Sequence, residues 1–149
     1  MQEDEPVGLA VARTGRILNR AFDDALAEVG GSLPVWLIVT ALKRGGHRTQ
    51  RDIAAVVGIE GATLTHHLSR MEEAGLVERH RASTNRRVQI VALTPEGDAL
   101  FVQMLAAVLD FDKRLRRRLS SGELTQLRSA LAILRENAAS TPIDASLTR

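Results

Sequence analysis

Apolar residues recur at three- and four-residue steps along most of this 149-residue chain, a period typical of amphipathic helices. Glycines separate the successive stretches, and Ser32, Thr49 and Ser120 stand where helix N-caps are expected. Ser120 and Glu123 have the spacing of a capping box. The predicted helices are residues 7–29, a helix from Ser32 to Gly45, residues 50–57, residues 61–74, a long helix from Pro95 that carries Leu119, and a last helix from Ser120 to about residue 138.

The period shortens between residues 76 and 93. Residues 76–80 and 88–93 read as short strands, and the polar, turn-prone residues between them predict a hairpin. A short helix, a glycine-containing turn, a second helix and then a two-stranded wing is the winged helix-turn-helix arrangement. We therefore expect one domain over residues 1–149, mainly α with a small two-stranded β wing. Its parts are a winged lobe (33–94), flanking helices (7–30 and 95–138) and a loosely held tail (139–149).

The composition argues against several classes of site. The chain has no cysteine, which excludes disulfides, thiolate metal sites and a thiol redox switch. No apolar run reaches the ~18 residues of a membrane span, so we expect a cytoplasmic protein without a membrane segment. No paired carboxylates, serine–histidine arrangement or phosphate-cradling glycine loop occurs at usable spacing, and His66 and His67 are adjacent on a helix and cannot face one metal. We expect no enzyme activity, no cofactor and no metal.

Positive charge gathers in one part of the chain. The net charge is +2, but residues 43–87 hold nine basic and five acidic side chains, a balance of +4 that leaves −2 for the remainder. Arginine supplies 18 of the 20 basic residues, and it suits bidentate contacts with phosphate and guanine. This segment favours a polyanionic partner, although charge alone fits a solvated surface equally well.

The helix at residues 61–74 has the two faces of a recognition helix. Leu64, Leu68 and Met71 share one face and are expected to point inward. The other face carries small residues near its N-terminus and hydrogen-bond donors that can reach bases or phosphates. Taken alone, the pattern also fits an ordinary surface helix, but the preceding helix and turn favour recognition.

The hairpin tip, residues 83–87, carries two adjacent arginines. An arginine at such a tip can enter a minor groove, where the negative potential is strong, while its neighbour holds a phosphate. A solvated loop is the alternative.

Four motifs together resemble the multiple antibiotic resistance regulator (MarR) family of bacterial transcription factors. They are RTQRDIAAVVGI (48–59), TLTHHLSRMEEAGLVER (63–79), NRR (85–87) and VALTPEG (91–97). The family usually has Asp-Arg-Arg at the wing tip, and Asn85 cannot form the ion pair that would orient Arg87. The resemblance implies a minor-groove role for Arg87, with Arg86 on phosphate. The expected DNA contacts are Thr49, Gln50, Ala62, Thr63, Thr65, His66, Ser69, Arg70, Asn85, Arg86 and Arg87.

The last helix predicts self-association. Its leucines at 124, 127, 131 and 134 have no other obvious partner, and an isologous homodimer is the simplest way to bury them, although a monomer could mask them internally. The resemblance implies the same dimer, and it implies a small effector, often an anionic phenolic compound. The candidate effector-binding residues are Arg13, Arg16, Asn19, Arg20, Trp36 and His67, although the arginines also fit a solvated face and His67 fits a packed, partly buried position.

The sequence thus predicts a dimeric, sequence-specific regulator that binds double-stranded DNA. We expect it to be a repressor that a small aromatic or anionic ligand releases from a palindromic operator. The alternative is a winged-helix module that binds an acidic protein partner.

Overall fold

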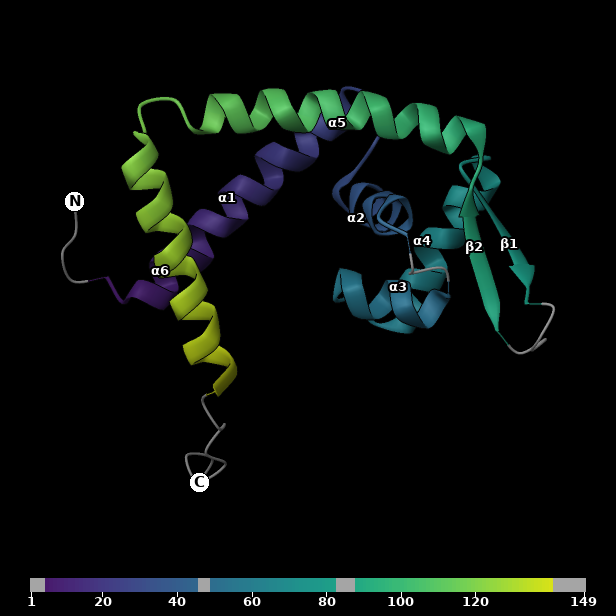
Figure 1. Cartoon of the computed structure of the whole chain (residues 1–149), viewed down its shortest axis with the longest axis horizontal. Helices are drawn as coiled ribbons and strands as arrows, with labels where there is room; N and C mark the ends of the chain where they lie inside the picture. Colours follow the sequence, from purple (N-terminus) through teal and green to yellow (C-terminus); the bar gives the residue numbers. More distant parts are fainter. Residues whose placement is uncertain (1–4, 46–48, 83–87, 141–149) are drawn as a thin grey trace. The chain divides into compact units, whose positions relative to one another are not determined.

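The computed structural model describes residues 5–45, 49–82 and 88–140. Its elements follow the predicted order, and the mainly helical fold with a two-stranded sheet is confirmed (Figure 1). They are α1 (Val7–Ala27), α2 (Leu33–Lys43), α3 (Gln50–Val57), α4 (Gly61–Glu73), β1 (Val77–Arg81), β2 (Gln89–Leu93), α5 (Pro95–Leu115) and α6 (Ser121–Ser140). The chain divides into two compact units, Met1–Phe111 and Asp112–Arg149.

Three helix ends illustrate how the observed bounds differ from the predicted ones. Helix α1 stops at Ala27, because the next residues tighten into a turn in which the Val29 N–H donates to the Leu26 carbonyl. Helix α5 stops at Leu115, so Leu119 lies in the following turn and not in the helix. Helix α6 extends to Ser140, two residues into the segment expected to be tail.

The core of the first unit lies among α2, α3, α4 and the sheet. Helix α2 contacts α1, α3, α4 and β2, which makes it the centre of this packing. Each element contributes at least one fully or almost fully buried apolar side chain. These are Leu26, Ile38, Val39, Ile53, Leu64, Leu68, Met71, Val77, Val91 and Met104.

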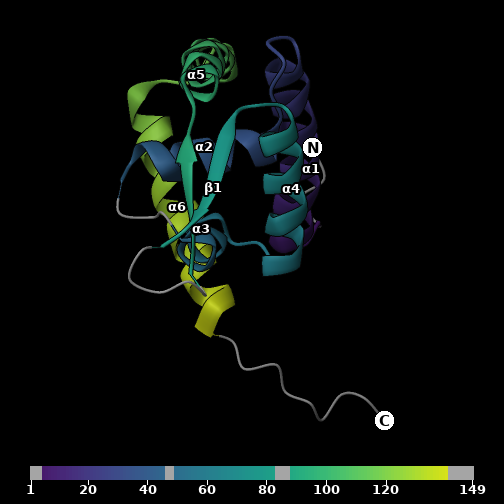
Figure 2. The ribbon, with the colours of Figure 1, turned by 90° about the vertical axis from the view of Figure 1, so that its right-hand side faces the viewer.

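The hairpin is antiparallel, with Val77 opposite Leu93 and Arg81 opposite Gln89. Figure 2 shows its strands running side by side with α4 next to β1. Val77 and Val91 anchor the sheet in the core, and Thr49 extends it through an isolated bridge to Ile90 on the other edge of β2.

Two aromatic pairs attach α5 to the rest of the first unit. Trp36 of α2 stacks on Phe101 with ring centroids 5.6 Å apart, and Phe22 of α1 meets Phe111 edge to face at 5.3 Å. Lys43 adds a cation–π contact with Phe101, its ammonium 5.5 Å from the ring centroid. These four aromatic residues are all that the chain has, and they serve to join helices.

In the second unit, Ser120 and Glu123 form the predicted capping box. The Ser120 hydroxyl accepts from the Glu123 N–H at 3.3 Å, while the Glu123 carboxylate accepts from the Ser120 hydroxyl and N–H, which lowers the pKa of Glu123. No residue of α6 is buried, and Leu127, Leu131 and Ile133 are exposed. Among the described helices, none has the length and apolar character needed to cross a membrane.

Candidate nucleic-acid interface

Helices α3 and α4 form a helix-turn-helix whose bend depends on one glycine. Gly58 ends α3 at φ +75°, a left-handed conformation that glycine adopts without strain. Its N–H and that of Ile59 both donate to the Ala54 carbonyl, at 2.9 and 3.2 Å. Helix α4 then starts at Gly61 and buries Leu64, Leu68 and Met71 as predicted.

The outer face of α4 is exposed over Ala62, Thr63, His66 and Arg70. Thr65 is also exposed, but its hydroxyl donates to the Gly61 carbonyl of its own helix at 2.9 Å. His66, Arg70 and Thr63 therefore present donors to the outside, and these are the side chains of α4 best able to reach base edges or phosphates.

Ser69, another predicted DNA contact, makes a hydrogen bond within the protein. It is half-buried, and its hydroxyl accepts from an Arg79 guanidinium N–H at 3.2 Å. The same guanidinium pairs with the Glu72 carboxylate, and this contact with Arg79 holds the pKa of Glu72 below its ordinary value. Sequence reasoning missed Glu72 and Arg79, although the alternation of β1 places Arg79 on the same face as the buried Val77.

Thr49 and Gln50 lie at the start of α3 beside β2. The Thr49 hydroxyl caps the helix, accepting from the Asp52 N–H at 3.1 Å and donating to the Asp52 carboxylate at 2.6 Å. The Gln50 Nε2 atom is buried and has no hydrogen-bond partner among the described residues. Both residues line a pocket of about 340 Å³ with Arg51, Val88 and Gln89. Arg51 is exposed in the first turn of α3 and is a further cation at this edge that the sequence reading passed over.

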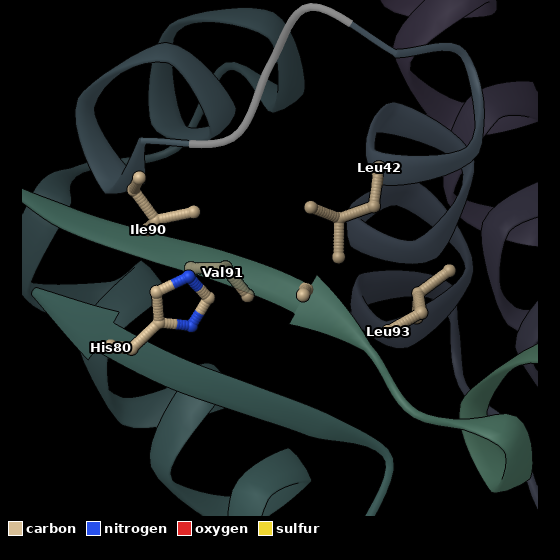
Figure 3. Close-up of a pocket in the computed structure, with 6 residues that line it drawn as sticks. Leu42, His80, Ile90, Val91 and Leu93 are labelled. Carbon is tan, nitrogen blue, oxygen red and sulfur yellow. The ribbon is translucent and has the colours of Figure 1, made fainter. Parts of the chain in front are cut away.

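The predicted wing residues Asn85, Arg86 and Arg87 lie outside the described residues. The strands that carry this segment are described as far as Ala82 and Val88, where the Ala82 N–H donates to the Val88 carbonyl at 2.9 Å. Near the hairpin base, a pocket of about 230 Å³ is lined by Leu42, His80 and residues 90–93 of β2. Figure 3 shows Leu42 and Ile90 facing each other across it, and His80 is the cross-strand partner of Ile90.

The six predicted effector residues do not gather at one site. Arg13, Arg16, Asn19 and Arg20 are exposed along α1, where Arg13 pairs with Glu5 at 3.1 Å, and Trp36 is engaged with Phe101. Of these six, only His67 lines a pocket of about 470 Å³ beside α4. The lining also includes Asp23 of α1, residues 30–32 between α1 and α2, Pro34 and Val35 at the start of α2, and Arg70, Met71 and Ala74 at the end of α4.

His67 is half-buried, and its ring centroid is 6.0 Å from that of His66 with the planes tilted by 56°. Among the residues that the structure describes, no group of three or more His, Asp or Glu side chains could hold a metal ion.

Comparison with known proteins adds a family model and solved structures. A model described as the MarR family matches residues 30–88. The transcriptional repressor CouR, solved bound to a 23-mer DNA duplex, is similar at 25% identity and TM-score 0.82, covering 91% of this chain and 98% of that one. A MarR family regulator from Rhodococcus sp. RHA1 matches at 25% identity and TM-score 0.74, over 84% and 89%. A mutant MarR from E. coli, solved with operator DNA, shares the fold at 22% identity and TM-score 0.80, over 87% and 93%.

Proposed function

The chain belongs to the MarR family of transcriptional regulators, and from this premise we propose that it represses transcription as a homodimer on a palindromic operator until a small ligand releases it. The family consists of DNA-binding regulators and not of enzymes. The exposed face of α4 is the observation that carries the proposal, because a packed helix-turn-helix there supports a row of free donors.

Within the proposed complex, α4 occupies the major groove. His66 and Arg70 lie one turn apart on the exposed face, so both can reach the same groove, and Thr63 lies one turn N-terminal to His66. In this complex the N-terminus of α3 would meet the phosphate backbone, with the exposed Arg51 as its side-chain contact. Arg87 is proposed to enter the minor groove and Arg86 to hold a phosphate.

Dimerisation is supported by apolar surface that the chain leaves uncovered. Leu127, Leu131 and Ile133 are exposed on α6, and Val102 and Leu109 are exposed on α5. An isologous contact would bury such stripes on both subunits and repeat the recognition helix at about 34–36 Å, one turn of DNA. The mass of the protein in solution at micromolar concentration tests this step, and a monomer would contradict it.

Ligand release is supported by the pocket that His67 lines. Arg70 belongs both to the exposed face of α4 and to the lining of this pocket, which also holds Asp23. An anionic ligand that pairs with the Arg70 guanidinium would withdraw that cation from the DNA. A ligand with a different preference for the free and bound protein would then lower operator affinity.

A gel-shift titration tests the proposed function. The probe is a duplex that the wild-type protein selects from a random-sequence library, with excess non-specific competitor at moderate salt. We expect Arg87→Ala to weaken binding and to reduce the magnitude of the slope of log affinity against log salt by about two, one for each subunit of the proposed homodimer, whereas Arg70→Ala changes the preferred sequence or strongly weakens binding. Arg117→Ala, at an exposed arginine in the turn after α5, is the matched control.

Two outcomes would contradict parts of this proposal. If no duplex is selected or shifted, the chain acts through another partner, and a winged-helix module that binds an acidic protein becomes the better reading. If Arg86 and Arg87 are both replaced and operator binding does not change, the wing assignment is wrong while the assignment of α4 stands.

A further inference from the structure

One carboxylate joins the candidate recognition helix to the first strand of the hairpin. The Oε1 atom of Glu72 accepts the main-chain N–H of Arg79 at 3.2 Å, and its Oε2 atom accepts the Arg79 Nε–H at 2.9 Å and an Nη2–H at 2.5 Å. The Nη2 group also donates to the Ser69 hydroxyl at 3.2 Å. We call Ser69, Glu72 and Arg79 the α4–β1 clamp. It fixes both the backbone and the side chain of one residue of β1.

The clamp lies at a position along β1 from which it can fix the direction of the hairpin. A two-stranded hairpin is marginal by itself, so its direction depends on what its base is attached to. Val77 is buried at the base, and Arg79 follows it on the same face, two residues nearer the tip. Arg81, the next residue on that face, is exposed, as are Glu78 and His80 on the other. Among the described residues of β1, Arg79 is thus the outermost one held to α4.

The clamp also has the chemistry of a rigid joint. Its hydrogen bonds are charge-assisted, and the guanidinium of an arginine presents its donors in a fixed planar fork. The Arg79 side chain is only 19% exposed, which protects the joint from solvent on one side, while Glu72 remains 39% exposed. A lysine could keep the charge at position 79 but not the fork, because its three donors sit on a single nitrogen atom.

We propose that the α4–β1 clamp is a positioning device, which sets the angle between the recognition helix and the wing so that both engage DNA at once. The inference rests on the proposed function, since it needs α4 and residues 83–87 to bind one duplex. Arg79 acts here through Glu72 and Ser69, and not by contact with DNA. Loss of the clamp is expected to leave the α4 contacts in place and to loosen those of the wing.

A double-mutant cycle separates positioning from direct contact, because the two readings predict opposite signs for Glu72→Gln. Removing a carboxylate near DNA reduces repulsion and should tighten binding, as expected for the control Glu73→Gln at the neighbouring exposed acid. If the clamp positions the wing, Glu72→Gln, Arg79→Gln and the double variant should instead each weaken operator binding by a similar factor, roughly three- to tenfold.

The second readout is a hydroxyl-radical footprint on the selected duplex. We expect the three clamp variants to lose protection at the outer minor grooves and to keep it where α4 lies, with a lower salt slope. Arg79→Lys should be intermediate, and melting curves of all variants show whether each is folded.

Three results would overturn the clamp. One is that Glu72→Gln and Arg79→Gln both bind the operator and protect it as the wild-type protein does. Another is that Arg79→Gln weakens operator binding while Glu72→Gln tightens it, with additive effects in the double variant. Arg79 would then be a direct DNA contact. The third is uniform loss of protection together with a lowered melting temperature, which would make the pair merely structural. Failure of the wild-type protein to select DNA would refute the proposed function, and the clamp with it.

Discussion

Replacing Gly97 with alanine is expected to destabilise the fold, because a side chain at this position meets the backbone of another element. Gly97 is buried in the first turn of α5, in the sequence TPEG. A Cβ atom there would lie 2.1 Å from the Leu76 carbonyl oxygen and 3.1 Å from the Leu93 Cδ2 atom. Heavy atoms pack best at about 3.5 Å, so the two segments must separate by about 1.4 Å, the difference between 3.5 and 2.1.

That separation would disturb a small network around Thr94. The Leu76 carbonyl accepts from the Thr94 N–H at 3.1 Å, the Thr94 hydroxyl donates to the Gly75 carbonyl at 2.6 Å, and the Gly97 N–H donates to the same hydroxyl at 3.0 Å. Overpacking costs about 1–3 kcal/mol and a weakened hydrogen bond about 1 kcal/mol, while alanine regains about 1 kcal/mol of helix propensity. The net loss is about 2 kcal/mol, which lowers the melting temperature of a chain this long by about 4–8 °C.

Thermal unfolding followed by far-ultraviolet circular dichroism measures this loss at a fixed protomer concentration, since self-association would shift the midpoint. Gly122→Ala is the matched control, because Gly122 lies in the first turn of α6 and its added Cβ would have only the Ser120 hydroxyl as a neighbour, at 4.0 Å. We expect this control to melt at or above the wild-type temperature. Equal melting of the two variants would refute the steric reasoning.

Two other properties of the fold follow from the hydrogen bonds described above. Thr49→Ala removes the cap of α3 and should lower the free energy of unfolding in a denaturant titration by about 1 kcal/mol, whereas Thr49→Ser should keep most of it; an equal loss in both would contradict the role of the hydroxyl. The pKa of Glu72 is held below its ordinary 4.5, so its stabilising contribution is complete above pH 4.5 and is lost as the pH falls through the folded-state value. Denaturant titrations at a series of pH values should show that the free energy of unfolding of the wild type falls with pH over this range, and that it falls less in Arg79→Gln.

The sequence predicts the helix-turn-helix well because its signals are local. The inward row of α4 follows from a 3.6-residue period, and all three predicted core residues are buried. Ser32, Thr49 and Ser120 cap the helices that follow them, since a cap needs only its own side chain and an N–H three residues on. The helix ends at Ala27 and Leu115 were less predictable, because apolar residues continue beyond them into tight turns.

The pocket beside α4 could be predicted only at His67, because the rest of its lining comes from separate elements. A row of arginines on α1 looks like an anion site in sequence, yet those side chains spread along an exposed helix. His67 instead shares a pocket with Asp23 and with the segment between α1 and α2, more than 30 residues earlier in the chain. Similarly, Glu72 and Arg79 meet only because the chain reverses at Gly75, whose φ is +71°.

Helix α4 faces β1, the pocket lined by His67 and the exposed surface with different sides. The spacing of its 13 residues explains how one helix can present all three. Residues three or four apart share a face of a helix. Ser69 and Glu72 form the pair that faces β1, and His67 and Arg70 form the pair that lines that pocket. His66, four residues before Arg70, stays on the exposed face. Because Arg70 lies where the pocket and the exposed face meet, its substitution should affect DNA and ligand together, whereas changes at His66 or Glu72 should separate recognition from positioning.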